Sequence, residues 1–132
     1  VGIAALLAGA KSCHALDIDS FAIEATLLNA ELNGVTLSAD QADITGGAPL
    51  ETDLFFCGDV FYDKNMTDKV LAFLDRTMEG GTPVLIGDPG RSYLPKKRLE
   101  LLATYHVPVV GALEDNEVKK TSVYRLLPKT GA

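Results

Sequence analysis

The fold is decided by Asp53-Leu54-Phe55-Phe56-Cys57-Gly58, which continues directly into Asp59-Val60-Phe61-Tyr62-Asp63. The first half is a continuous apolar run that ends at a glycine, and such a run is typical of a parallel strand covered on both faces. Apolar side chains then recur at helical spacing over residues 67–79, and residues 83–86 form a second short apolar run. We therefore expect a strand, a helix and a second, parallel strand.

Further helices and strands are predicted on both sides of this unit. Before it we expect a helix, a strand, a helix capped by Asp19, and a strand, over residues 1–8, 12–16, 19–33 and 35–39. After it we expect a helix that starts at Pro95 and two strands, over residues 95–105, 107–113 and 122–127. Only a polar loop separates the last two strands, so they should pair antiparallel. The predicted fold class is α/β: one domain over residues 1–132, with a mainly parallel sheet that ends in an antiparallel hairpin.

Composition narrows the class of function. The chain has 132 residues, of which 47% are hydrophobic, and a formal net charge of -6. An acidic surface repels phosphate backbones, so it disfavours nucleic-acid binding and favours a basic partner. Cys13 and Cys57 lie in apolar runs without metal-ligand spacing to either histidine, so we expect buried free thiols and no metal site. No apolar run reaches the roughly 20 residues that cross a bilayer, so no membrane association is expected.

Acidic residues follow several of the predicted strands. Asp17, Asp59 and Asp88 each stand at such a strand end, and Asp43 makes a fourth if the strand after residue 35 extends that far. Ligands of open α/β sheets bind outside the carboxyl ends of the strands, where a carboxylate can accept hydrogen bonds from ribose hydroxyls. We assign this role to Asp17. Nicotinamide-dependent enzymes carry similar acids, so Asp17 alone does not identify the cofactor.

The stretch from Gly58 to Asp63 can carry chemistry at such an edge. Gly58 permits a sharp turn, Phe61 and Tyr62 can form walls, and the Asp59 carboxylate could hold a lysine ammonium or accept its proton. An ordinary strand exit explains the same residues equally well. After the next strand, Asp88 can shape a tight turn, while Arg91 could either pair with a carboxylate or face solvent.

Several segments together resemble one family. Asp17-Ile18-Asp19, followed by Leu28-Asn29-Ala30-Glu31-Leu32-Asn33, is similar to the ribose-binding strand and next helix of class I S-adenosylmethionine-dependent methyltransferases. Gly58-Asp59-Val60-Phe61-Tyr62-Asp63, the segment from Val84 to Arg91, and Thr121-Ser122-Val123-Tyr124 resemble the lysine methyltransferases of the electron transfer flavoprotein β-subunit, including their bacterial relatives. The spacing Asp59-x-x-Tyr62 is typical of a wider group of protein-lysine methyltransferases.

This resemblance implies a protein-lysine N-methyltransferase of the bacterial cytoplasm, with S-adenosyl-L-methionine as cofactor and the flavoprotein β-subunit as substrate. Carried over by position, the implied catalytic residues are Asp59 and Tyr62, and the implied cofactor-binding residues are Asp17, Ile18, Asp43 and Gly58. The implied substrate-binding residues are Phe61, Asp88 and Arg91.

The resemblance also implies a Rossmann-like sheet with strand order 3-2-1-4-5-7-6. The first strand of this order and its glycine-rich loop would precede Val1, so the central strand would be missing. Two long apolar strand edges would then remain unpaired. We therefore predict that the 132 residues alone neither fold well nor bind the cofactor strongly.

Other interpretations stay open at this point. The same fold could act on ribosomal protein L11, on a small amine such as nicotinamide, or on a nucleobase. Base-directed enzymes typically have Asn-Pro-Pro-Tyr where this chain has Asp59-Val60-Phe61-Tyr62, which disfavours a nucleobase. A dinucleotide-binding redox or sensor domain explains Asp17 but requires a second βαβ half. A binding module without catalysis is a further alternative, and a strand with Gly-x-Gly-x-Gly upstream would favour an enzyme.

Overall fold

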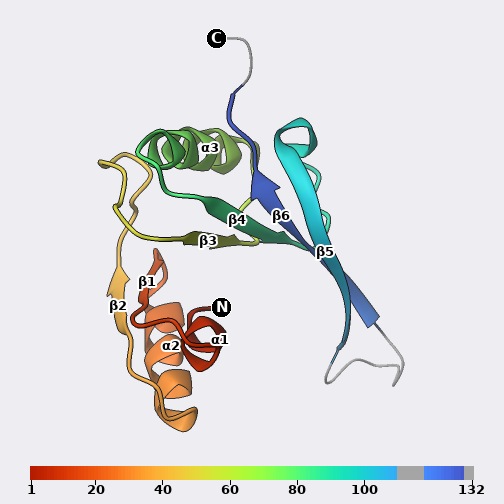
Figure 1. The fold of residues 1–132 in the computed structure, drawn as a ribbon. Coiled ribbons are helices and arrows are strands. Elements are labelled where there is room, and N and C mark those ends of the chain that lie inside the picture. The colour runs from red at the N-terminus through yellow and green to blue at the C-terminus, as the bar shows by residue number, and fades with distance from the viewer. Residues whose placement is uncertain (110–117, 130–132) are drawn as a thin grey trace. The chain divides into compact units, whose positions relative to one another are not determined.

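The computed structural model describes residues 1–109 and 118–129 (Figure 1). The chain divides into two compact units, Val1–Ile44 and Thr45–Ala132, and each is described by itself below. Both units combine helices with strands, as the predicted α/β class requires. Among the described residues, no helix is both long and apolar enough to span a membrane.

The first unit is built around one strand–helix–strand repeat. Its elements are α1 (Gly2–Leu7), β1 (His14–Asp17), α2 (Ser20–Leu32) and β2 (Ser38–Gln41). β1 and β2 pair in parallel, and α2 contacts both strands. The predicted N-cap of α2 is confirmed, because the Asp19 carboxylate accepts a hydrogen bond from the Phe21 backbone N–H at 2.9 Å. β2 begins three residues later than the sequence predicted.

The second unit carries a four-stranded sheet. Its elements are β3 (Phe55–Gly58), α3 (Lys64–Glu79), β4 (Val84–Asp88), the short 3-10 helix η1 (Lys96–Arg98), β5 (Leu99–Pro108) and β6 (Val118–Leu126). The strand order is β3-β4-β6-β5, with β3 parallel to β4 and both later pairings antiparallel. The largest fully buried side chains include Phe61, Phe73, Leu74, Ile86 and Leu126, so the core lies between α3 and the sheet.

The two strand orders agree with the order that the resemblance implied. The pair β2-β1 corresponds to its 3-2 end, and β3-β4-β6-β5 corresponds to its 4-5-7-6 end. Among the described residues, no strand corresponds to strand 1, which would lie at the centre of that order. The predicted antiparallel pairing of the last two strands is also confirmed.

The helix predicted from Pro95 to residue 105 is wrong. Only Lys96–Arg98 form a helical turn, and Leu99–Pro108 are strand β5, paired with β6 from Leu99 opposite Leu126 to Pro108 opposite Val118. Residues 99–102 fit a helix by their apolar spacing, but the backbone hydrogen bonds of a long hairpin outweigh that local preference. Residues 110–113 of the strand predicted over 107–113 lie outside the described residues, as does most of the predicted loop.

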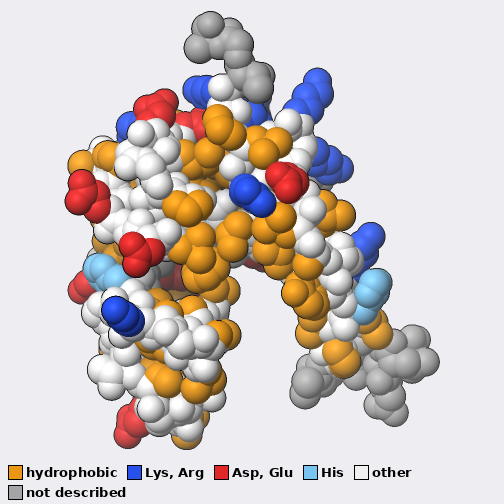
Figure 2. Space-filling view, viewed as in Figure 1, with side chains coloured by type: hydrophobic (Ala, Val, Ile, Leu, Met, Phe, Trp, Pro, Cys, Tyr) orange, Lys and Arg blue, Asp and Glu red, His pale blue; other side chains and the backbone are white. Residues whose placement is uncertain are grey.

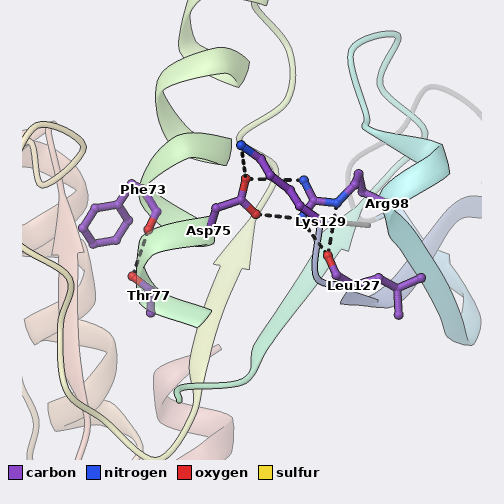
Figure 3. Close-up of polar contacts among 6 residues, drawn as sticks. All are labelled: Phe73, Asp75, Thr77, Arg98, Leu127 and Lys129. Atoms are coloured by element: carbon purple, nitrogen blue, oxygen red, sulfur yellow. Dashed lines mark hydrogen bonds and ion pairs between the residues drawn. The ribbon is translucent and has the colours of Figure 1, made fainter. Parts of the chain in front are cut away.

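A largely buried ion pair joins α3 to the segments that lie directly before β5 and directly after β6 (Figure 3). Asp75 on α3 is only 10% exposed, and its carboxylate accepts a 2.6 Å hydrogen bond from the Arg98 guanidinium. The same guanidinium donates to the backbone carbonyl of Leu127 just beyond β6, at 2.7 Å from Nη2 and 3.1 Å from Nε. Lys129 adds a longer, exposed contact to Asp75 at 3.6 Å. Each partner of such a pair offsets the desolvation of the other, so removal of one partner would leave an uncompensated charge in a largely buried place.

Large apolar side chains remain exposed in each unit. Figure 2 shows hydrophobic side chains along the β5–β6 hairpin, where Leu101, Tyr105 and Val118 are among the exposed residues. In the first unit, the exposed apolar side chains include Phe21 and Leu32 on α2. Uncovered apolar surface of this extent is unfavourable in water. It supports the prediction that these 132 residues fold poorly alone, which stays a prediction.

Candidate cofactor and substrate sites

In the first unit, the predicted cofactor residues gather at the carboxyl ends of β1 and β2. Ile18 and Asp43 line one open cavity of about 260 Å³, together with Gln41 and Ala42. Asp17 is the last residue of β1, directly before Ile18. The structure therefore brings these predicted residues together, and Asp43 lines the same cavity as Ile18 although β2 ends at Gln41.

Backbone contacts fix the shape of this cavity. The Ala42 N–H donates to the Asp17 carbonyl at 2.9 Å, and the Gln41 side-chain amide donates to the Ile18 carbonyl at 3.1 Å. The Asp17 carboxylate accepts a hydrogen bond from the Asp19 N–H at 2.9 Å, which orients it at the start of α2. A cavity of this size accommodates one ring system of a ligand. Sequence reasoning missed Gln41, because a glutamine at a strand end carries no distinctive signal.

In the second unit, Asp59 and Arg91 form a two-contact ion pair where β3 and β4 end. Arg91 Nε lies 2.8 Å from Asp59 Oδ1, and Arg91 Nη2 lies 3.0 Å from Asp59 Oδ2. Parallel pairing sets the two strand ends side by side, with Gly58 opposite Gly87 and the Asp59 N–H donating to the Gly87 carbonyl at 2.9 Å. Asp59 also has a φ of 48°, a left-handed conformation that aspartate tolerates better than most residues.

Asp88 places the backbone that carries Arg91. Its side chain is buried, with 1% of the residue exposed, and Oδ2 accepts hydrogen bonds from the N–H groups of Gly90 at 2.7 Å and Arg91 at 2.8 Å. Gly90 has a φ of 103°, which favours glycine in this tight turn. Asp88 Oδ1 is buried without a hydrogen-bond partner among the described residues. Asp88 therefore shapes the turn, and its burial is at odds with direct contact with a substrate.

The ion pair changes the acid–base character of Asp59. Hydrogen bonding to Arg91 holds the pKa of the Asp59 carboxyl below its ordinary value of 3.8, and the charges of Arg91 and Lys119 act in the same direction. Pairing with Asp59 correspondingly raises the pKa of Arg91. A carboxylate with a lowered pKa is a weak base at neutral pH. The geometry thus favours an orienting role for Asp59 over proton abstraction, two roles that the sequence left open.

The two aromatic residues after Asp59 have opposite environments. Phe61 is 0% exposed and belongs to the core, whereas Tyr62 is 54% exposed. The expectation that both form walls of a site therefore needs correction, because a fully buried Phe61 cannot touch a ligand in this conformation. Asp63 follows as the N-cap of α3, accepting a hydrogen bond from the Met66 N–H at 3.0 Å. Aspartate before a helical pattern is the usual signal of such a cap.

Comparison with known proteins identifies sequence relatives. The family model for ribosomal protein L11 methyltransferase (PrmA) matches residues 1–57. The electron transfer flavoprotein β-subunit lysine methyltransferase of Danio rerio is 36% identical over 129 residues, covering 93% of this chain and 50% of that protein. Its Xenopus laevis counterpart is 39% identical over 132 residues, covering 96% of this chain and 54% of that protein. The chain thus spans about half the length of these relatives.

A more distant relative is the ribosomal protein L11 methyltransferase of Exiguobacterium, 30% identical over 121 residues that cover 87% of this chain and 37% of that protein. The flavoprotein-directed relatives named here are vertebrate proteins, so these comparisons do not support the expected bacterial source.

Solved structures show the same fold. The N-methyltransferase NodS from Bradyrhizobium japonicum, in complex with S-adenosyl-L-homocysteine, matches with a TM-score of 0.59 at 13% identity, covering 88% of this chain and 67% of that one. The structure of protein 1320 from Thermoplasma acidophilum matches with a TM-score of 0.59 at 20% identity, covering 98% of this chain and 69% of that one. The chain therefore has the fold of class I, S-adenosylmethionine-dependent methyltransferases, and its sequence is similar to about half of a flavoprotein β-subunit lysine methyltransferase.

Proposed function

We propose that this chain is part of an S-adenosylmethionine-dependent protein-lysine N-methyltransferase that acts on the electron transfer flavoprotein β-subunit. The observation that carries the proposal is the Asp59–Arg91 pair, which presents a fixed carboxylate at the adjacent ends of β3 and β4, next to exposed Tyr62. The names of the relatives at 36% and 39% identity support the choice of substrate. Residues 1–132 would belong to a single cytoplasmic methyltransferase domain.

The first unit supplies residues that fit a nucleoside cofactor. Asp17 would accept hydrogen bonds from the ribose hydroxyls, while Ile18 would contact the adenine face and Asp43 its amino edge. The cavity that Ile18 and Asp43 line is of a size for such a ring. Gly58, at the end of β3 in the second unit, stays a proposed cofactor residue on the resemblance alone. Bound S-adenosylmethionine would supply an electrophilic methyl group.

Asp59 would orient the acceptor amine in this scheme. A carboxylate has about four lone-pair positions, and the two hydrogen bonds from Arg91 use two of them. The remaining positions can accept N–H groups of a neutral lysine amine and direct its lone pair toward the methyl group. Tyr62 would contact the aliphatic stem or the amine. The acceptor's proton leaves to solvent, because Asp59 is a poor base. Alignment of the reacting atoms would supply most of the rate enhancement.

Methylation of ribosomal protein L11 is the second candidate, favoured by the PrmA match. That match ends at Cys57, two residues before Asp59. The part shared with that family model therefore includes the first unit and β3 up to Cys57, and it contains the proposed cofactor residues Asp17, Ile18 and Asp43 but not Gly58. The residues proposed to select the substrate follow it in the chain, so the match supports the fold and the cofactor more than it supports L11.

The test is to map the methylated residue. The intact protein is incubated with methyl-labelled S-adenosylmethionine and, in separate reactions, flavoprotein β-subunit, ribosomal protein L11 and nicotinamide. We expect label on lysine side chains of the β-subunit, located by peptide mass spectrometry. Label on L11 alone would establish the second candidate, and cofactor binding without transfer to any acceptor would indicate a binding module.

A further inference from the structure

Three side chains form a continuous set of contacts at the ends of β3 and β4. The buried Asp88 carboxylate holds the backbone N–H of Arg91 at 2.8 Å, and the Arg91 guanidinium holds both oxygens of Asp59 at 2.8 and 3.0 Å. The Arg91–Asp59 contacts join the segment after β4 to the segment after β3, and the Asp88 contact closes the turn that leads to Arg91. The position of the Asp59 carboxylate is therefore set by β4 as well as by its own loop.

The pair also sets the charge that an incoming amine would meet. Asp59 and Arg91 together are neutral, whereas Asp59 alone would carry a full negative charge. A negative charge beside a lysine stabilises its ammonium form and raises its pKa, which is already about 10.4 in free lysine. The ammonium form has no lone pair and cannot accept a methyl group. Removal of Arg91 should therefore favour the unreactive form of the substrate.

We propose that Arg91, placed by Asp88, is a positioning residue that fixes and neutralises Asp59, so that Asp59 does not stabilise the unreactive ammonium form of the acceptor lysine. This inference rests on the proposed lysine methylation. It assigns to Arg91 an effect on the protonation state of the substrate, in place of direct substrate binding.

Other charged and titratable groups act on the pair and are expected to modulate this effect. Asp88 and Tyr62 act on Arg91, and Lys119 of β6 acts on Asp59. Both side chains of the pair are partly exposed, at 43% for Arg91 and 46% for Asp59, so water weakens their interaction in the free protein. A docked substrate would exclude that water and strengthen the influence of the pair on the amine.

Replacement of Arg91 with Gln and with Lys in the intact protein tests the inference. The pH dependence of kcat reports groups in the enzyme–substrate complex, so it is measured from pH 6.5 to 10 with the lysine substrate. For Arg91→Gln we expect the ascending limb of kcat to move up by about one pH unit, with kcat at pH 7.5 reduced about tenfold. Arg91→Lys keeps the charge but loses the fork geometry, so the limb should stay in place while kcat falls.

Arg125→Gln is the matched control. Arg125 lies on β6 of the same sheet, and its side chain is 54% exposed; its ion pair within the described part of the chain is a long one, at 3.7 Å to Glu100. Its kcat profile should superimpose on that of the wild type. Circular dichroism and the S-adenosylmethionine Kd of each variant are measured to show that the fold and cofactor site persist.

Each outcome is decisive. A wild type that methylates lysine, together with an Arg91→Gln profile whose limb does not move, would overturn the inference and leave the proposed function standing. A uniformly lower kcat at every pH would show that Arg91 is merely structural, which also overturns it. A wild type that methylates no lysine would remove the proposed function and this inference with it.

Discussion

The strand ends of the two units are built differently. At the ends of β1 and β2, side chains surround an open cavity of about 260 Å³, and the contacts that shape it involve backbone groups of neighbouring residues. At the ends of β3 and β4, both aspartates bind Arg91: its side chain donates to Asp59, and its backbone N–H donates to Asp88. The first arrangement leaves open space that a ligand can fill. In the second, contacts within the protein already hold the side chains in place.

This difference agrees with the proposal that the first unit binds the cofactor and that the ends of β3 and β4 bind the acceptor. A cofactor binds through complementary contacts, so its site gains from open space beside hydrogen-bonding groups. Methyl transfer depends on alignment of the acceptor to within a fraction of an ångström, so its residues gain from being held in advance. The predictions below separate the two arrangements by stability, by cofactor affinity and by turnover.

The largest effect is expected from the buried pair that supports the second unit. Replacement of Asp75 with Ala leaves Arg98 without its carboxylate partner, and loss of one member of a buried pair costs about 3 kcal/mol or more. The free energy of unfolding, measured by denaturant titration of the intact protein, should fall by that amount. Lys129→Ala removes only the exposed 3.6 Å contact and should cost less than about 1 kcal/mol. Equal losses in both variants would contradict the assignment of Arg98 as the principal partner.

A smaller effect, confined to the cofactor, is expected at the open arrangement. Replacement of Asp17 with Ala removes a charged acceptor for the ribose hydroxyls, and such hydrogen bonds contribute about 1.5–3 kcal/mol. The Kd for S-adenosylmethionine, measured by calorimetry, should rise about ten- to a hundredfold. Turnover at saturating cofactor should change little.

Asp19→Ala is the control for that variant, because Asp19 lies two residues away and caps α2. Its loss should cost about 1 kcal/mol of stability with little change in Kd. If Asp19→Ala weakened cofactor binding as much as Asp17→Ala, the ribose role of Asp17 would be wrong.

The sequence predicted the parallel strand–helix–strand units well, because their apolar runs and helical spacing are local signals. β3, α3 and β4 all appear within three residues of their predicted bounds, and Asp19 caps α2 as expected. Cys13 and Cys57 are free thiols as expected, but both are half-buried and not fully buried. Desolvation raises the pKa of the Cys57 thiol to about 12. β5 was mistaken for a helix, because its pairing with β6 depends on residues about 20 positions away.

The positions of the candidate site residues along the strands were predictable from the sequence, but their contacts were not. The positions of Asp17, Ile18 and Asp43 follow from strand ends, which the apolar pattern locates. The pairing of Asp59 with Arg91 spans 32 residues and requires β3 and β4 to be neighbours in register, which no local pattern specifies. The burial of Phe61 beside exposed Tyr62 depends likewise on packing of the loop against the core.

The most direct test of the central claim, that Asp59 serves the acceptor and not the cofactor, is to measure turnover and cofactor affinity together in Asp59→Asn. Asparagine tolerates the positive φ of this position, so the backbone should persist where alanine would be strained. With the flavoprotein β-subunit as acceptor, we expect methyl transfer by the intact protein to fall about a hundredfold or more, while the Kd for S-adenosylmethionine stays within about twofold. Asp59→Ala should lose transfer as well. Unchanged turnover in both variants, or a loss of cofactor affinity equal to the loss of turnover, would contradict the claim.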